Sequence, residues 1–485
     1  MQIPFTRLPG YNQIFIDYIY NFDKLQSFYN YSYKSDTDFI RAIQGRQNSY
    51  LKNSEFDRNT IADILKIQNK FFNSGEKAIQ NIELLKNENT FAIVTGQQAG
   101  LLTGNLYSVI KAIDAIKLSN DLNKKFPEFN FVPVYWIEAD DHDFTEVNNI
   151  NILTKENKLL NIEWIEGGQK QDKYLKPAYT IVFDEFIDNF RQLIKENLQH
   201  TDFKDLLLEN IEKVTRQGLN LPTSFARFLN FLLMDSGLVF FDSTDTEIKK
   251  LLIPVFLKEL NSFPETCEKV IETTAILEQE YSPQVKPKAI NLFYKHNGNR
   301  YAIEPLPEKF FGLKNSRQRF PADELFDILY ANPENFSPNV ILRPVCQDFL
   351  LPTVAYIGGP SEVAYFAQFK KVYNFYGIDI PVIYPRTNIT IIENRVNNFL
   401  VKYGIKPEEL FDERKVSSKL ISRINEVSID KIFENFKDEL NANTYSICNE
   451  IRKIDKNIET LFKNKVSKFL DSLGSVRKKL EDTQL

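Results

Sequence analysis

Residues 91–137 decide the fold, because two apolar segments there flank a glycine-rich turn and an amphipathic helix. Residues 91–105 read FAIVTGQQAGLLTGN, and residues 131–137 read FVPVYWI. Short apolar runs that end in glycine or in charged residues are typical of buried strands. Between them, apolar residues recur at helical spacing over residues 106–122, and Asn105 stands at the expected N-cap. The order strand, helix, strand predicts a βαβ unit with parallel strands.

A second unit of the same kind occupies residues 352–384. Its expected elements are a strand, a turn, a helix capped by Ser361 and a second strand, at residues 352–357, 358–362, 363–376 and 380–384. Two such units predict an α/β protein with a Rossmann-like, doubly wound parallel sheet. We interpret residues 1–390 as this core, with a mainly helical N-terminal segment and an inserted connecting region at about 150–335. Within the insertion, Asn297-Gly298 predicts a hairpin turn.

Residues 391–485 contain little glycine and many charged residues. Apolar residues from Ile447 to Leu480 follow one another at spacings of three and four, which indicates one helical face. We expect an α-helical coiled coil, an antiparallel hairpin in which this face packs against an earlier helix. The apolar residues expected from that earlier helix are Leu420, Ile424, Val427, Ile432 and Phe436. The alternative is an ordinary amphipathic helix packed on the core.

Composition and charge are those of an ordinary globular protein of 485 residues, 43% hydrophobic and 26% charged. A net charge of −5 with interspersed signs predicts no nucleic-acid partner and no membrane partner. Residues 1–7 lack the features of a signal peptide, and no apolar run has the length of a membrane span. Three scattered cysteines predict neither a disulfide framework nor a zinc site. We therefore expect a cytoplasmic protein.

Three glycines four residues apart, Gly96, Gly100 and Gly104, form the first candidate binding feature. Their spacing matches neither the dinucleotide fingerprint nor the Walker A loop, but glycine lets backbone N–H groups approach a ligand. The N-terminus of the following helix favours a phosphate or carboxylate. The neutral donors and the one cation that could contribute are Thr95, Gln97, Gln98, Thr103, Asn105 and Lys111. The alternative is a tight structural turn, with Lys111 facing solvent.

The densest ionisable cluster is Asp140-Asp141-His142-Asp143, directly after the second predicted strand. The carboxyl ends of parallel strands share one edge of the sheet, so this cluster and the glycine turn should flank one cleft. His142 would act as a general base toward an attacking amine, with a carboxylate orienting its ring. The same oxygens would also suit Mg²⁺, or they would only cap the next helix.

The turn at residues 358–362 is predicted to frame the other side of the cleft. The candidate binding residues there are Tyr356, Gly358, Gly359, Ser361 and Glu362. Arg343 and Arg386 border the same strands and are candidate clamps for a carboxylate or phosphate, although a surface role fits the sequence equally well. Cys346 has no histidine partner in the sequence pattern, so we interpret it as a small buried hydrophobe.

The wording of four motifs resembles the bacillithiol-biosynthesis cysteine-ligase family, BshC, over about residues 90–390. These motifs are TGQQAGLLTG (95–104), WIEADDHD (136–143), YIGGPSE (356–362) and YPR (384–386). The resemblance implies a core like that of class I aminoacyl-tRNA synthetases, with insertions and a coiled coil that supports homodimers. It also implies the addition of L-cysteine to the amine of glucosaminyl malate through an amide, giving bacillithiol.

Two departures from the family accompany this resemblance. Asn105 stands where many relatives have proline, and the family continues past the coiled coil with further helical sequence. Amide formation from a carboxylate requires activation, so we expect ATP and Mg²⁺ to take part, although the sequence contains no standard ATP motif. Two alternatives remain at this stage: a nucleotidyltransferase on the same fold, and a non-enzymatic ligand-binding or docking protein.

Overall fold

The computed structural model describes residues 1–53, 58–169, 175–424 and 429–484. The chain forms two compact units, residues 12–388 and residues 1–11 together with 389–485. None of the described helices is long and apolar enough to cross a membrane.

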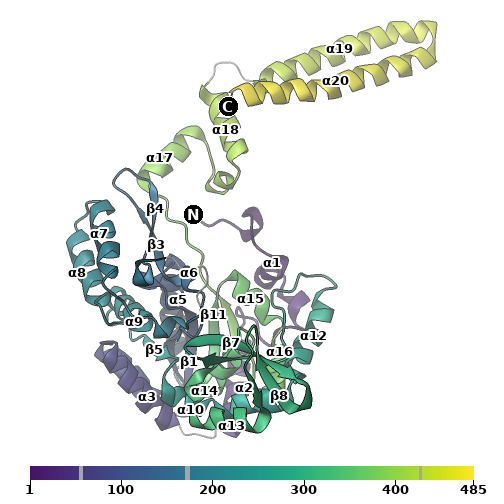
Figure 1. Cartoon of the computed structure of the whole chain (residues 1–485). Helices are drawn as coiled ribbons and strands as arrows, with labels where there is room; N and C mark the ends of the chain where they lie inside the picture. The colour runs from purple at the N-terminus through teal and green to yellow at the C-terminus, as the bar shows by residue number, and fades with distance from the viewer. Residues whose placement is uncertain (54–57, 170–174, 425–428, 485) are drawn as a thin grey trace. The chain divides into compact units, whose positions relative to one another are not determined.

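The larger unit is built on a five-stranded parallel sheet, of which β1, β5 and β11 are labelled in Figure 1. Its strand order is β12-β11-β1-β2-β5. The strands are β1 (Thr90–Gln98), β2 (Asn130–Glu138), β5 (Val239–Asp242), β11 (Thr353–Gly358) and β12 (Val382–Pro385). From β1 the chain first proceeds to β2 and β5 on one side, and later returns to β11 and β12 on the other. The strand order therefore reverses between β1 and β11, and such a switch point is where open α/β sheets bind ligands. The predicted Rossmann-like, doubly wound sheet is confirmed.

Helix α5 (Leu106–Lys125) connects β1 to β2, as the sequence predicts. The single helix expected at residues 363–376 is wrong, because the structure has two short helices there, α15 (Pro360–Phe366) and α16 (Lys370–Tyr376). The break between them contains the buried Gln368, whose side chain bonds the backbone of Gln284 and Val285. A continuous helix would not present this amide to that segment in the same way. Ser361 is not the cap, since α15 begins at Pro360.

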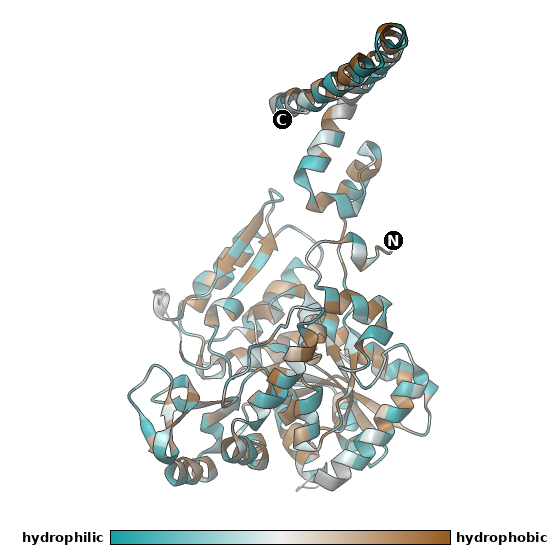
Figure 2. Cartoon of the chain, turned by 90° about the vertical axis from the view of Figure 1, so that its right-hand side faces the viewer, coloured by the Kyte–Doolittle hydropathy of each residue, from teal (hydrophilic) through white to brown (hydrophobic). Residues whose placement is uncertain are grey.

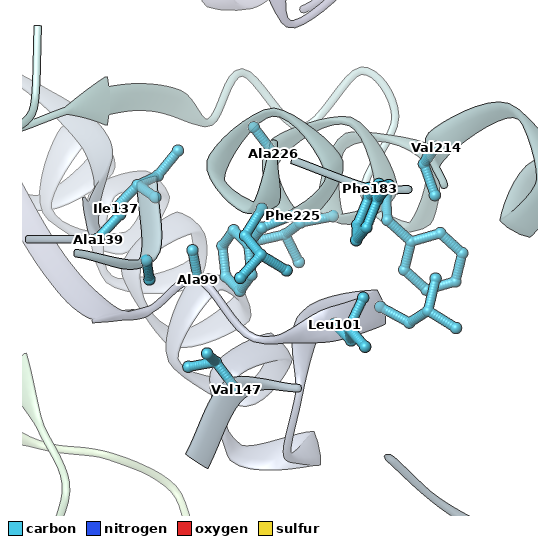
Figure 3. Close-up of a cluster of buried hydrophobic side chains, with 14 of the residues drawn as sticks. Ala99, Leu101, Ile137, Ala139, Val147, Phe183, Val214, Phe225 and Ala226 are labelled. Carbon is cyan, nitrogen blue, oxygen red and sulfur yellow. The ribbon is translucent and has the colours of Figure 1, made fainter. Parts of the chain in front are cut away.

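Strand β5 lies inside the region 150–335 and joins the edge of the core sheet, so it divides the connecting sequence into two insertions. The first insertion contains α6 (Phe144–Val147), β3 (Asn149–Leu153), β4 (Leu159–Glu163), α7 (Ile187–Asn197), α8 (Lys204–Val214) and α9 (Leu221–Leu232). Its apolar side chains form a buried cluster with residues from the ends of β1 and β2, including Ala99 and Ile137 (Figure 3).

The second insertion carries a separate five-stranded antiparallel sheet with the order β10-β6-β7-β8-β9. Its elements are α10 (Thr246–Leu251), α11 (Ile253–Ser262), α12 (Glu265–Leu277), β6 (Leu292–His296), β7 (Asn299–Leu306), β8 (Phe310–Leu313), β9 (Arg319–Pro321), α13 (Ala322–Ala331), β10 (Phe336–Pro338) and α14 (Arg343–Leu350). The hairpin predicted at Asn297-Gly298 joins β6 to β7. Both turn residues have positive φ, as a tight two-residue hairpin requires.

The N-terminal segment is helical, as expected, and packs on the sheet. Its helices are α1 (Gln13–Tyr20), α2 (Asp36–Asn53), α3 (Arg58–Phe71) and α4 (Glu76–Leu84). Arg46 on α2 is 1% exposed, and its guanidinium donates to the carbonyl oxygens of Thr353, Asp348 and Asp379. This single side chain therefore holds α2 against the start of β11.

In the second unit, two long helices pack side by side as an antiparallel hairpin, α19 (Ile429–Ile454) and α20 (Lys456–Gln484). Two shorter helices precede them, α17 (Asn394–Tyr403) and α18 (Glu413–Ile424). The coiled coil is confirmed, but the continuous face expected from Ile447 to Leu480 is wrong, because the helix breaks at Asp455. Leu420 and Ile424 belong to α18 and not to the hairpin, and Val427 lies outside the described residues.

Candidate active site

A cleft of about 830 Å³ opens at the carboxyl ends of β1, β2 and β11, next to the switch point. Twelve of the residues predicted from the sequence line it: Gly96, Gln97, Gln98, Lys111, Asp141, His142, Arg343, Tyr356, Gly359, Ser361, Glu362 and Arg386. The two strand-to-helix turns and the acidic cluster therefore do flank one cleft, as the parallel sheet requires.

Lys111 is a buried cation at the floor of this cleft. Its ammonium donates to the Gly96 carbonyl oxygen at 2.8 Å and to Gln97 Oε1 at 3.0 Å, and it forms an ion pair with Glu362. Glu362 also accepts from the Tyr356 hydroxyl and from the Gly359 N–H, both at 2.7 Å. Lys111 therefore ties the end of β1 to the turn after β11, and the alternative of a solvent-facing lysine is wrong.

Burial and pairing act in opposite directions on this ion pair. Burial opposes the charge of Glu362, but Lys111 outweighs it, so the pKa of Glu362 is lowered. The pKa of Lys111 is also lowered, because burial outweighs its attraction to Glu362. A lowered pKa favours the charged form of the glutamate but disfavours the charged form of the lysine. We attribute this difference to exposure, which is 2% for the lysine side chain and 19% for the glutamate. The charge of Glu362 is compensated, whereas that of Lys111 is only partly compensated.

The remainder of the glycine turn lies outside the cleft lining. Gly100, Thr103, Gly104 and Asn105 are not among the residues that face the cleft, and Ala99, Leu101 and Leu102 are buried in the apolar cluster of the first insertion (Figure 3). A Cβ at Gly100 would lie 3.0 Å from Gly104 Cα, and Gly104 has a φ of +63°. This geometry supports the alternative of a tight structural turn for residues 100–105. Asn105 holds the N-cap position without a side-chain cap, because its amide donates to the Tyr107 hydroxyl.

The cluster at residues 140–143 is divided in the same way. Asp141 and His142 line the cleft, whereas Asp140 is 3% exposed and forms a 2.6 Å ion pair with Lys249. Asp143 is exposed and accepts from the Thr145 hydroxyl at 2.7 Å. The geometry therefore gives Asp140 a structural contact between β2 and α10, and it leaves Asp141 and His142 as the pair that can meet a ligand.

The second insertion supplies a residue to this pair that the sequence did not reveal. Arg300 on β7 is 6% exposed and donates to Asp141 Oδ1 at 3.2 Å, while the same nitrogen lies 3.4 Å from His142 Nδ1. Its other donors bond Ser337 Oγ and the Pro338 carbonyl oxygen, and its guanidinium stacks on the Phe293 ring. Asp141 also accepts from Gln98 Nε2 at 3.0 Å. The carboxylate is thus held from both sides of the cleft.

Two charged side chains of opposite sign line the cleft without bonding each other. Glu138, the last residue of β2, accepts from Trp136 Nε1 and from the Asp140 N–H, both at 3.2 Å. Arg343, at the start of α14, donates to Gln347 Oε1 at 3.1 Å and to the Tyr356 hydroxyl at 3.4 Å. In the described part of the chain, neither residue forms a salt bridge. Burial, together with the nearby charge of Asp140, raises the pKa of Glu138.

The remaining predicted residues are close to the cleft or contribute backbone. Thr95 is buried and donates to the Ile357 carbonyl oxygen, and Gly358 accepts from the Arg386 N–H. Arg386 itself packs over the Tyr107 ring and donates to Asn388 Oδ1. Cys346 is fully buried and its pKa is raised by burial, in agreement with its interpretation as a hydrophobe. Lining residues that the sequence interpretation missed include Tyr107, Trp136, Glu138, Glu146, Lys286, Lys288, Phe293, Arg300, Asn339 and Tyr365.

The described residues contain no group of three acidic, histidine or cysteine side chains placed to hold a metal ion. The acidic cluster, for which Mg²⁺ was an alternative, provides one carboxylate to the cleft because Asp140 is bonded to Lys249. A nucleotide phosphate would instead meet Arg343, Arg386 and the exposed Lys286 and Lys288, all of which line the cleft. These cations fit an anionic ligand.

The fold and the cleft define a Rossmann-like α/β protein with a charged ligand site at the switch point of its sheet. The family model "Bacillithiol biosynthesis BshC, N-terminal Rossmann-like domain" matches residues 1–387, and "Bacillithiol biosynthesis BshC, C-terminal coiled-coil domain" matches residues 389–485. The chain belongs to the BshC family, and the resemblance of its motifs is confirmed.

Curated relatives with the name "Putative cysteine ligase BshC" resemble the chain over nearly its full length. The protein from Chloroherpeton thalassium is 31% identical and covers 98% of this chain and 83% of the relative. The protein from Chlorobaculum tepidum is also 31% identical, with 98% and 86% covered. The protein from Flavobacterium psychrophilum is 30% identical, with 99% and 86% covered.

Proposed function

We propose that this protein adds L-cysteine to glucosaminyl malate by forming an amide between the cysteine carboxyl group and the sugar amine. The observation that carries the proposal is the cleft at the switch point, which combines a candidate base, His142, and the carboxylate of Asp141 with several cations. The family to which the chain belongs is named for bacillithiol biosynthesis, and its curated relatives are named as cysteine ligases. This combination favours a ligase over a simple binding protein.

The groups of the cleft suit the separate demands of amide formation. The amine must lose a proton as it attacks, and His142 is the candidate general base, with Asp141 orienting its ring. Nδ1 of His142 lies 3.4 Å from Asp141 Oδ1, the contact through which the carboxylate would orient the ring. Negative charge on the reacting carbonyl group would be stabilised by Arg343. ATP, as Mg-ATP, would supply the activation of the carboxylate that this reaction requires.

The deciding experiment incubates the protein with L-cysteine, glucosaminyl malate and Mg-ATP, and follows the thiol products by mass spectrometry. Bacillithiol that forms only when all three are present would support both the ligase and the ATP requirement. The nucleotide product, AMP or ADP, would identify which phosphate is transferred. Bacillithiol levels unchanged in cells that lack the gene would contradict the proposal.

A nucleotidyltransferase on the same fold is the second candidate function, and the cations beside the switch point are what favour it. Such an enzyme would release pyrophosphate from ATP and accumulate an adenylated product without joining cysteine to the sugar. The same incubation separates the two functions, because mass spectrometry would detect the adenylate. Replacement of His142 by alanine should reduce turnover in the ligase but should leave a non-enzymatic role in cells intact.

We also propose that the protein acts as a cytoplasmic homodimer joined through the α19–α20 hairpin. Apolar side chains remain exposed along these helices, among them Ile447, Ile458, Leu461 and Val476, and Figure 2 shows apolar and polar residues alternating along them. A second copy of the hairpin would cover these residues. Sedimentation equilibrium should give twice the chain mass for the wild type, and Ile458→Lys with Leu461→Lys should give a monomer. A monomeric wild type at micromolar concentration would contradict the dimer.

A further inference from the structure

Arg343 is a cation at the cleft that the described protein groups leave without a counter-charge. Its side chain donates to the amide oxygen of Gln347 and the hydroxyl of Tyr356 and is hydrogen-bonded to the Tyr365 hydroxyl, all of which are neutral partners. Burial opposes the charge of Arg343, but its pKa is raised by Tyr356 and Tyr365 and, to a smaller extent, by Glu138 and Glu362. Neither glutamate forms a salt bridge with it among the described residues. A guanidinium that faces a cleft and forms no salt bridge can still donate to a carboxylate of a ligand.

Glu138, at the end of β2, is the complementary case. Its two carboxylate oxygens accept only from the Trp136 indole and the Asp140 N–H, both neutral donors at 3.2 Å. Among the cations that act on its pKa, Arg343 has the largest effect, whereas Lys249 is paired with Asp140 and Arg300 with Asp141. A carboxylate kept in a partly buried cleft without a cation is costly unless a ligand supplies one.

These two residues influence one another electrostatically, since each contributes to the pKa of the other, and no salt bridge joins them among the described residues. Both side chains line the same cleft. A ligand that carries an ammonium and a carboxylate on neighbouring atoms would satisfy both side chains at once. The free α-amino acid is the common small molecule with that pattern.

We propose that Glu138 and Arg343 form the recognition site for the zwitterionic backbone of the amino-acid substrate, with Glu138 binding its α-ammonium and Arg343 its α-carboxylate. The inference rests on the proposed function, because it places cysteine in the cleft where the amide forms. It also gives the cleft an order: the carboxyl group to be activated lies at Arg343, on the side of Tyr356 and Glu362. The remaining cations, Lys286 and Lys288, are left for the second substrate or the nucleotide.

The test uses the full chain and equilibrium binding by calorimetry, with three thiols that differ by one charged group. L-Cysteine carries both groups, cysteamine lacks the carboxylate, and 3-mercaptopropionate lacks the ammonium. The wild type should bind L-cysteine roughly 10–100-fold more tightly than either analogue, since each lost contact is a charge-assisted hydrogen bond. Arg343→Gln should abolish the preference for L-cysteine over cysteamine and keep the preference over 3-mercaptopropionate. Glu138→Gln should do the reverse.

Matched controls are Arg319→Gln and Glu304→Gln, which remove exposed charges outside the cleft lining and should change neither preference. Tryptophan fluorescence confirms that each variant is folded, and Arg343→Lys should keep part of the preference over cysteamine. Equal binding of all three thiols by the wild type, or preferences that survive both cleft substitutions, would overturn the inference. A loss of turnover in Glu138→Gln with both preferences intact would also overturn it, because that pattern belongs to a proton-transfer role.

The two proposals fail in different ways. If the wild type forms bacillithiol but does not discriminate between the thiols, the recognition site is wrong and the proposed function stands. If it discriminates between the thiols but forms no product, the amino-acid site stands and the ligase is wrong.

Discussion

Replacement of Lys111 by methionine is expected to destabilise the core unit by about 3 kcal/mol, the lower end of the range for breaking a buried ion pair. Lys111 is 1% exposed and methionine has a similar apolar stem, so the change leaves little cavity. The cost arises from the carboxylate of Glu362, which loses its cation, and from the Gly96 carbonyl oxygen, which loses a donor. Glu362 keeps its bonds to Tyr356 and Gly359, which moderates the loss.

The reverse substitution, Glu362→Gln, should cost about as much or more, because it leaves the less exposed charge without its partner. The pKa of Lys111 is already lowered by burial, and it should fall further in this variant. A base whose pKa is lower in the folded state is destabilising while it is charged. The penalty of Glu362→Gln should therefore shrink as the pH rises through the folded pKa of Lys111 toward 10.5, whereas that of Lys111→Met should not.

Denaturant unfolding followed by tryptophan fluorescence measures the stability of both variants in the unit that contains the ion pair, residues 12–388. The two tryptophans of the chain, Trp136 and Trp164, are buried in the unit of residues 12–388. The double variant should lose less than the sum of the single losses, by at least about 1 kcal/mol, because the pair is coupled. Single losses below about 1 kcal/mol, or strictly additive losses, would refute the description of Lys111 as the tie between the two turns.

Three further predictions concern other charged groups. Lys249→Met should destabilise the core by about 3–5 kcal/mol in the same assay, since Asp140 would remain buried without its cation; unchanged stability with lost turnover would contradict its structural role. At pH values above 4.5, Glu138→Gln should unfold at a higher denaturant concentration than the wild type, because burial raises the pKa of this carboxyl and its ionised form opposes folding. For the same reason, L-cysteine binding to the wild type, measured by calorimetry, should weaken on acidification at a higher pH than the pKa of an ordinary glutamate would give. Glu459 is paired with Arg452 and Lys463, which lower its pKa to about 2, so Glu459→Gln should speed hydrogen exchange around the α19–α20 turn at neutral pH. That difference should disappear as the pH falls from 4.5 toward 2, and equal exchange rates at pH 7 would contradict it.

The sequence predicted the core of the fold because its signals are local. Each strand of the two βαβ units is a short apolar run next to a glycine turn, and a parallel sheet follows from their order. Features that depend on contacts between distant segments were not predicted. Gln368, in the break between α15 and α16, bonds a segment distant in sequence, and the hairpin turn at Asp455 lies inside an uninterrupted apolar spacing. Neither is visible from periodicity alone.

For the site, the sequence pointed to the strand ends that border the cleft but could not divide their residues between structure and binding. Asp140 and Asp141 are neighbours of identical chemistry, and only the position of Lys249 decides that the first is bonded inside the protein. Glu138 belongs to the same motif, but a single glutamate at a strand end carries no signal of its own. It becomes a candidate only when its surroundings are known to lack a bonded cation.

The arrangement of the cleft also explains why the motifs of the core do not by themselves make the site. Arg300, Phe293 and Arg343 all come from the second insertion, and Arg300 is fixed by Ser337 and Pro338 on a neighbouring strand of that insertion. This guanidinium then holds Asp141, so the orientation of a core carboxylate is set by the inserted sheet. The Rossmann-like core provides the glycine turns and the strand-end acids, which many proteins of this fold share in kind. We therefore expect the choice of ligand to be made where the insertion meets the core, so substitutions at that junction should change substrate preference without unfolding the sheet.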